Sequence, residues 1–208
     1  IKDWYKEVDG FTKEELRLIQ TEPFGENEFK KEYGIKRFVA NKTGIAARKA
    51  LVGEPTCNIA GFVSGYTGPG AKTVLPAQAL VKIDFRLVPK MDPLKQLARL
   101  KQHLKSNGFG DIKVNMIHGE AASKTKILDP FVSKVKEAAN ESFGKSIVSV
   151  SSAGTGPMYS FAKVLSAPCI SIGSTYIFSR IHSPNEFARI DLLNKTTKCI
   201  CRIMSKFD

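Results

Sequence analysis

A single histidine, His182, lies in a turn between an apolar run and an expected helix, within residues 181–186 (IHSPNE). A neutral imidazole at such a junction is a good ligand for a divalent metal ion. Pro184 and Asn185 favour a turn that presents the ring, and Glu186 can hold the ring through a hydrogen bond. The alternative is a surface or hydrogen-bonded structural histidine, which residue type alone does not exclude. His182 is therefore a candidate metal ligand.

Two further polar side chains, Arg86 and Thr73, stand where they could bind a substrate. Arg86 falls on the polar face of an expected strand, and a guanidinium binds a carboxylate in a bidentate fork, which suits a peptide C-terminus. A cross-strand salt bridge is its alternative role. Thr73 follows a glycine-rich turn, where its hydroxyl could bond either a substrate or the turn itself. These two residues form the candidate substrate-binding set on this part of the chain.

The loop at residues 153–157 (AGTGP) opens an expected helix. Its backbone N–H groups and the helix dipole favour a negative group, and its glycines permit close approach. The spacing and the lysine of a phosphate-binding P-loop are absent. Gly154 and Thr155 are therefore expected to contact a carboxylate or a backbone amide.

Residues 55–116 show the pattern of a small α+β layer that would carry Thr73 and Arg86. Apolar residues at 57–63 predict a strand that ends at the glycine-rich turn 65–70. Strict alternation over 81–87 predicts a second strand with one polar face. Asp92 and Pro93 predict the start of an amphipathic helix that runs to Gly108, and residues 112–116 alternate again as a further strand.

From residue 127 the pattern becomes α/β. Asp129 and Pro130 predict a helix that stops at Gly144, short strands are expected at 147–150 and 169–172, and further helices begin at Pro157 and near Asp191. Two strands and three helices are too few to close a sheet of this class. Residues 127–208 are therefore interpreted as the second half of a domain whose first half lies elsewhere. The polar stretch 119–126 is the expected boundary.

Composition narrows the classes of partner. The chain has 208 residues, of which 42% are hydrophobic, and a net charge of +12 from 32 Lys and Arg against 20 Asp and Glu. The basic residues are scattered and lack the interleaved aromatic residues of a stacking platform, so no nucleic-acid partner is expected. No apolar run approaches the roughly 18 residues that span a bilayer. The four cysteines lack metal or redox spacing. Neither a membrane nor an oxidising compartment is expected, and a cytoplasmic location is predicted.

Five segments taken together resemble the motifs of a known family, in the same order and spacing: residues 55–59 (PTCNI), 65–68 (GYTG), 72–76 (KTVLP), 84–89 (DFRLVP) and 182–186 (HSPNE). They are similar to those of the di-zinc metallopeptidases that include carnosinases, cytosolic dipeptidases, aminoacylases and succinyl-diaminopimelate desuccinylases. The dipeptidase branch is the most similar, and the resemblance covers nearly the whole chain.

The resemblance implies an α/β catalytic domain interrupted by an α+β lid of antiparallel sheet and helices, and the lid forms a homodimer. Residues 1–125 would be most of the lid, and 126–208 the C-terminal part of the mixed-sheet catalytic domain. His182 would correspond to a ligand of one of two zinc ions, with manganese and cobalt as alternatives. Arg86 and Thr73 would hold the carboxylate end of a peptide substrate, commonly in the partner subunit's active site. Gly154 and Thr155 would line the pocket.

The resemblance also places the family's HxD motif, bridging aspartate and paired glutamates upstream of Ile1. One histidine cannot hold two metal ions, and without the glutamate there is no general base. No catalytic residue is therefore expected in this chain, which alone should be inactive. The favoured function is the C-terminal portion of a metal-dependent dipeptidase-like peptidase. The alternatives are an N-acyl-amino-acid amidohydrolase of the same family and a non-catalytic scaffold that retains the lid.

Overall fold

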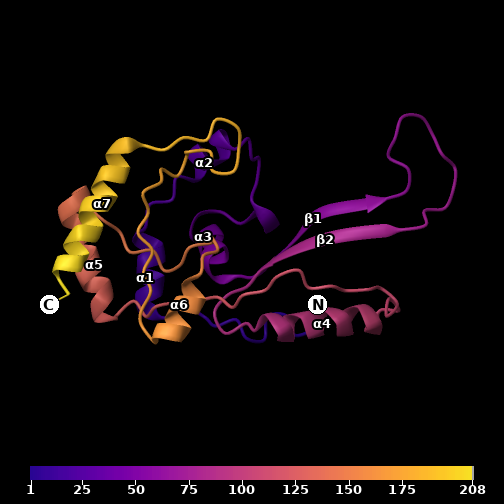
Figure 1. Ribbon diagram of the computed structural model, residues 1–208, viewed down its shortest axis with the longest axis horizontal. Helices are drawn as coiled ribbons and strands as arrows, with labels where there is room; N and C mark the ends of the chain where they lie inside the picture. The colour runs from indigo at the N-terminus through magenta and orange to yellow at the C-terminus, as the bar shows by residue number, and fades with distance from the viewer. Residues whose placement is uncertain (208) are drawn as a thin grey trace. The chain divides into compact units, whose positions relative to one another are not determined.

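The computed structural model describes residues 1–207 (Figure 1). Contacts divide the chain into two units, and the polypeptide passes between them three times. Unit 1 comprises residues 1–9 and 54–122, and unit 2 comprises residues 10–53 and those from 123 onward. Among residues 1–207, no helix has the length and apolar character that crossing a bilayer requires. The elements of unit 1 are β1 (Thr56–Ser64), β2 (Ala79–Arg86) and α4 (Pro93–Ser106). Those of unit 2 are α1 (Lys13–Thr21), α2 (Glu26–Glu32), a short 3-10 turn η1 (Val39–Asn41), α3 (Gly44–Gly53), α5 (Pro130–Phe143), α6 (Met158–Leu165) and α7 (Ile190–Ser205).

The two strands of unit 1 form an antiparallel hairpin with a bulge between Ile59 and Gly61. Paired residues share a face of the sheet. Thr56 pairs with Arg86 on the polar face, and Ile59 pairs with Ile83 on the apolar face. The predicted polar face of β2 is confirmed. At Ile59 the apolar face is 70% exposed.

Ion pairs join the N-terminal segment, residues 1–9, to the rest of unit 1. Glu7 contacts Arg99, its Oε1 lies 2.7 Å from Lys95 Nζ, and its Oε2 accepts from Gln96 Nε2 at 3.3 Å. Trp4 packs its ring 5.0 Å from that of Phe85 on the apolar face of the hairpin. The inward side of α4 therefore includes a polar residue, Gln96, which is 3% exposed, whereas Leu94 is 67% exposed.

Unit 2 is organised around the packing of α5 against α7 (Figure 1). Asp129 caps α5 by accepting from the Phe131 N–H at 2.9 Å, and Gly144 ends the helix with a φ of 90°. Both predictions of the sequence are confirmed. Small side chains let the two helices approach closely. The shared core contains Val135, Ala138 and Ala139 of α5 with Cys199 and Ile203 of α7.

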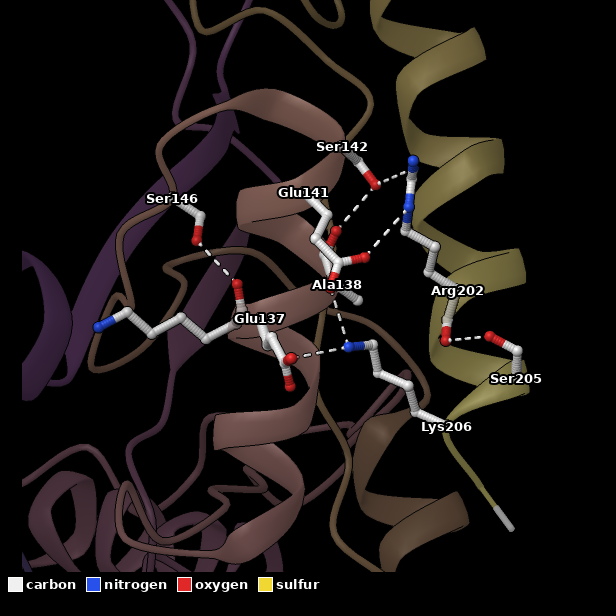
Figure 2. A network of polar contacts seen from close by, with 9 residues as sticks. Glu137, Ala138, Glu141, Ser142, Ser146, Arg202, Ser205 and Lys206 are labelled. Atoms are coloured by element: carbon white, nitrogen blue, oxygen red, sulfur yellow. Dashed lines mark hydrogen bonds and ion pairs between the residues drawn. The ribbon is translucent and has the colours of Figure 1, made fainter.

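A polar network crosses the outer edge of the same helix pair (Figure 2). Lys206 Nζ contacts Glu137 and Glu141 at 2.9 Å each, and Arg202 contacts Glu141 at 3.2 Å and the Ser142 hydroxyl at 2.8 Å. Hydrogen bonds from Lys206 to Glu137 and Glu141 raise the pKa of the lysine. Because exposed ion pairs contribute little free energy, this network is expected to add little to the stability of the helix pair.

The strands predicted at 112–116, 147–150 and 169–172 are not formed, and these three predictions are wrong for the described chain. A strand needs a partner for its backbone groups, and β1 with β2 is the one ladder among residues 1–207. At Cys169 the backbone groups form hydrogen bonds with a side chain instead of a neighbouring strand. The Thr125 hydroxyl donates to the Cys169 carbonyl at 2.6 Å and accepts from its N–H at 2.9 Å.

Residues 10–53 group with the C-terminal part of the chain in unit 2. The first helix of this segment begins at a capping box, in which Thr12 and Glu15 exchange hydrogen bonds. Glu15 forms an ion pair with Lys124, and Glu22 accepts from the Ser149 hydroxyl at 2.6 Å. These contacts join the segment to the C-terminal part of the chain. The switch of units near residue 122 lies close to the predicted boundary, while the assignment of a lid and a catalytic part stays a prediction.

Ala138→Leu should destabilise the whole protein, because Ala138 is completely buried between α5 and α7. Overpacking a filled core costs about 1–3 kcal/mol, so the urea midpoint of unfolding should fall. Lys136→Leu places the same side chain at an exposed position of α5 and should change the free energy of unfolding by about 0.5 kcal/mol or less. Equal midpoints for the two variants would contradict close packing of the helices.

Glu7 should make the protein sensitive to acid. Hydrogen bonds from Arg99 and then Lys95 hold the pKa of Glu7 far below its ordinary value of 4.5. The stability that its ion pairs contribute is therefore present above that ordinary value and lost as the pH falls below it. The difference in Tm between the wild type and Glu7→Gln should be largest near neutral pH and shrink below about pH 4.

Asp9→Asn is the matched control for this measurement, because it removes an exposed carboxylate of the same segment. Solvent screens that ion pair, so the variant should change Tm much less. A Tm difference for Glu7→Gln that does not depend on pH would show that the carboxylate does not pair with Arg99.

Candidate functional site

His182 lies in a loop between α6 and α7, here called the His182 loop (residues 176–187). Three of its residues have left-handed backbone although none is glycine, with φ of 58° at Arg180, 62° at His182 and 63° at Asn185. Such backbone is strained and persists only where surrounding contacts determine it. The exposed imidazole of His182 is thus presented by an unusually constrained turn.

Hydrogen bonds within the loop supply part of that constraint. The Phe187 N–H donates to the Ser179 carbonyl at 3.1 Å and closes the loop. Ser183 donates to the Arg180 carbonyl from both its N–H, at 3.0 Å, and its hydroxyl, at 2.6 Å. Glu186 accepts from the backbone N–H of His182 at 3.4 Å. The sequence predicts that this carboxylate holds the ring, whereas the contact observed is with the main chain.

Aromatic side chains fix the base of the loop where it joins α7. Tyr176 packs against Phe178 and Phe187, with ring centroids 5.5 and 6.5 Å away. The Arg189 guanidinium lies 5.7 Å from the centre of the Tyr176 ring and binds Asp191 through two hydrogen bonds, of 3.0 and 2.7 Å. These bonds lower the pKa of Asp191 and raise that of Arg189, so the pair stays charged at the start of the helix.

Arg86 is the last residue of β2 and lies on its polar face. Its Nε donates to Asp84 Oδ2 at 3.0 Å, and both side chains are half exposed. This ion pair with Asp84 runs along the strand. Asp84 orients a guanidinium that remains accessible to solvent.

Thr73 lies in the exposed loop that joins β1 to β2, at the opposite end of the hairpin from Arg86. Ala79 begins β2 at the loop end and Arg86 ends it, so the strand alone separates the two ends by about 23 Å. Figure 1 shows the loop extending beyond the strands. A dipeptide spans only about 7 Å when extended. Thr73 and Arg86 of this chain are therefore not brought together around a single dipeptide.

Gly154 and Thr155 lie in the exposed segment before α6. The Gly154 N–H donates to the Ser152 hydroxyl at 3.1 Å, so this amide already has a partner within its own loop. No side chain forms a capping hydrogen bond at the first turn of α6. The predicted contact of Gly154 and Thr155 with a substrate stays a prediction.

Tyr33, for which no sequence motif predicts a role, lies against the His182 loop. Its hydroxyl donates to the Ile177 carbonyl at 3.2 Å, across 144 residues of chain. A contact between residues so far apart leaves no local pattern of spacing or periodicity in the sequence. Only the folded arrangement could reveal it.

Comparison with known proteins decides the family. The sequence model of the peptidase family M20/M25/M40 matches residues 23–206. This chain belongs to that family. The resemblance inferred from the five motifs is therefore confirmed, and the M20 match extends through elements of both units.

Individual M20 relatives agree with this assignment. Human Beta-Ala-His dipeptidase is 24% identical over 188 residues, covering 88% of this chain and 37% of that protein. The crystal structure of the M20 family metallo-carboxypeptidase Sso-CP2 from Sulfolobus solfataricus is 36% identical, with a TM-score of 0.86 over 98% of this chain and 47% of that one.

Two more distant structures share the fold. The di-peptidase Dug1p from Saccharomyces cerevisiae is 21% identical, with a TM-score of 0.81 over 96% of this chain and 43% of its own. Human carnosine dipeptidase 1 is 23% identical, with a TM-score of 0.78 over 98% of this chain and 44% of its own. The chain spans less than half the length of each of these relatives.

M20 metallopeptidases generally use divalent metal ions, which require a cluster of ligating side chains. Within residues 1–207, no group of three or more His, Cys, Asp and Glu side chains could hold a metal ion. A zinc site needs three or four protein ligands. The described residues therefore do not fit a complete metal site, and the role of His182 as a metal ligand stays a prediction.

Proposed function

We propose that this chain is the C-terminal portion of a metal-dependent, dipeptidase-like peptidase that hydrolyses dipeptides or short peptides. The observation that carries the proposal is the M20 match over residues 23–206, which includes all five candidate site residues. The 36% identity to a metallo-carboxypeptidase supports the same chemistry. Arg86, oriented by Asp84 at 3.0 Å, is suited to bind the free carboxylate that every dipeptide carries.

In the proposed whole protein, His182 supplies one ligand to a metal ion, with zinc expected and manganese or cobalt as alternatives. The remaining ligands and the general base come from an upstream segment, so residues 1–208 alone are inactive. Gly154 and Thr155 contact the peptide substrate. Cytoplasmic location and the absence of nucleic-acid and membrane partners stay predictions.

We further propose that the active protein is a homodimer formed through unit 1. The positions of Thr73 and Arg86 support this proposal. They lie at opposite ends of one hairpin, whose strand β2 is itself about 23 Å long, so both can act on substrate only if they serve different active sites. One of the two would then reach a substrate bound by the partner subunit.

The alternative is an N-acyl-amino-acid amidohydrolase, because such substrates end in the same carboxylate that Arg86 would bind. A non-catalytic scaffold is a third reading, and it predicts no hydrolysis by the whole protein. A panel of dipeptides and N-acetyl amino acids, tested with zinc and with manganese, separates the three. Hydrolysis of dipeptides in preference to N-acetyl amino acids is the outcome expected here.

His182→Ala in the whole protein should abolish most of the hydrolysis and weaken zinc binding. Loss of a residue that merely orients a ligand costs about 10–100-fold, so loss of a ligand should exceed 100-fold. His103→Ala is the matched control, since His103 lies on α4 in unit 1 and its ring contacts Asn107. Zinc affinity, measured by competition with a chelator, should be unchanged in the control. Retained affinity in His182→Ala would show that this histidine is not a ligand.

Arg86→Ala should lower kcat/KM for dipeptides by about 10- to 100-fold, the loss expected for hydrogen bonds to a charged group. Dipeptide amides lack the carboxylate and should lose much less. Lys82→Ala is the control, because it removes a cation from the same face of β2. An equal loss on dipeptides and their amides would show that Arg86 does not bind the substrate carboxylate.

A further inference from the structure

The His182 loop is held from outside as well as from within, by residues at the end of α2. The Tyr33 hydroxyl donates to the Ile177 carbonyl at 3.2 Å, where the chain enters the loop. The Glu32 carboxylate lies 3.7 Å from Arg180 Nε, two residues before His182. Figure 1 shows α2 beside the segment that leads to α7. The distant helix therefore contacts the strained loop at two points.

The helix that makes these contacts is itself fastened. The Tyr33 ring packs 4.6 Å from that of Phe29, one turn earlier in α2. At the other end, Glu26 accepts from the Gly44 N–H at 2.7 Å, at the start of α3, and pairs with Lys30 at 2.5 Å. These two bonds lower the pKa of Glu26, so its carboxylate remains charged. Tyr33 is thus presented by an element that is anchored to its neighbour.

The loop needs such an anchor. Left-handed backbone at Arg180, His182 and Asn185 costs free energy and persists only where contacts determine it. The bonds inside the loop set its local shape, but they do not fix it to the rest of unit 2. The hydroxyl of Tyr33 and the carboxylate of Glu32 provide fixed points on both sides of Phe178 and Ser179.

We infer that Tyr33, assisted by Glu32, is a positioning residue for His182, and that α2 thereby holds the imidazole ready for metal binding. A ligand held in its bound geometry binds more tightly, because less ordering remains to be done on binding. The inference rests on the proposed role of His182 as a metal ligand. It assigns a site-building role to a segment that the sequence placed in the lid.

The first test is hydrogen exchange in the metal-free whole protein, read at the amides of Ser179, Ser183 and Phe187. Tyr33→Phe removes only the hydroxyl and keeps the packing on Phe29, so exchange at these amides should rise about five-fold, as expected for one hydrogen bond. Glu32→Gln should have a smaller effect, because an exposed ion pair contributes less. Tyr5→Phe is the control, since Tyr5 is exposed in unit 1. Unchanged exchange in Tyr33→Phe overturns the inference.

The second test is zinc affinity of the same proteins. Tyr33→Phe should weaken zinc binding by a similar factor of about five, and Tyr5→Phe should leave it unchanged. Faster exchange with unchanged zinc affinity would also overturn the inference, because the contact would then order the loop without positioning a ligand. Failure of the proposed function is seen separately, as zinc affinity that His182→Ala does not diminish. Exchange in the metal-free protein does not depend on that result.

Discussion

The packing of α5 against α7 is the contact on which the rest of unit 2 depends. Small, fully buried side chains at Ala138 and Cys199 allow the helices to approach closely. No sheet performs this organising role among the described residues of the unit, because the extended segments at 147–150 and 169–172 have no ladder partner. Ile170 and Ile172 instead pack against the core of the helix pair. The helix pair therefore holds the segments that an α/β domain would place in its sheet.

This packing also determines where the candidate metal ligand stands. α7 begins just after the His182 loop, and the pair formed by Arg189 and Asp191 fixes its first turn. One end of the loop is consequently anchored to the helix pair, and the other is held by Tyr33 at the end of α2. The left-handed residues lie between these anchors. The left-handed backbone at His182 is therefore held by α2 and α7, which are far apart in the sequence.

Local signals in the sequence were sufficient for much of the fold. Asp92 with Pro93 and Asp129 with Pro130 start their helices as predicted, because a cap acts on backbone groups within three residues. Gly144 ends α5 because its left-handed backbone suits glycine. The alternation that predicts β2 is equally local.

The features that the sequence could not supply are nonlocal. Residues 112–116 have the alternation of a strand, but a strand forms only where a partner lies alongside. The association of residues 10–53 with unit 2 depends on ion pairs such as that between Glu15 and Lys124. For the candidate site, residue types indicated His182 and Arg86. Spacing could not show that Arg86 pairs with Asp84, or that Thr73 stands at the far end of the hairpin.

The central claim is that His182 is one ligand of a metal site completed by residues outside this chain. Anomalous diffraction at the zinc edge, from crystals of the whole protein, tests it most directly. The account predicts an anomalous peak about 2.0–2.1 Å from a ring nitrogen of His182, with the other ligands contributed by residues upstream of Ile1. A zinc site formed without His182 would contradict it.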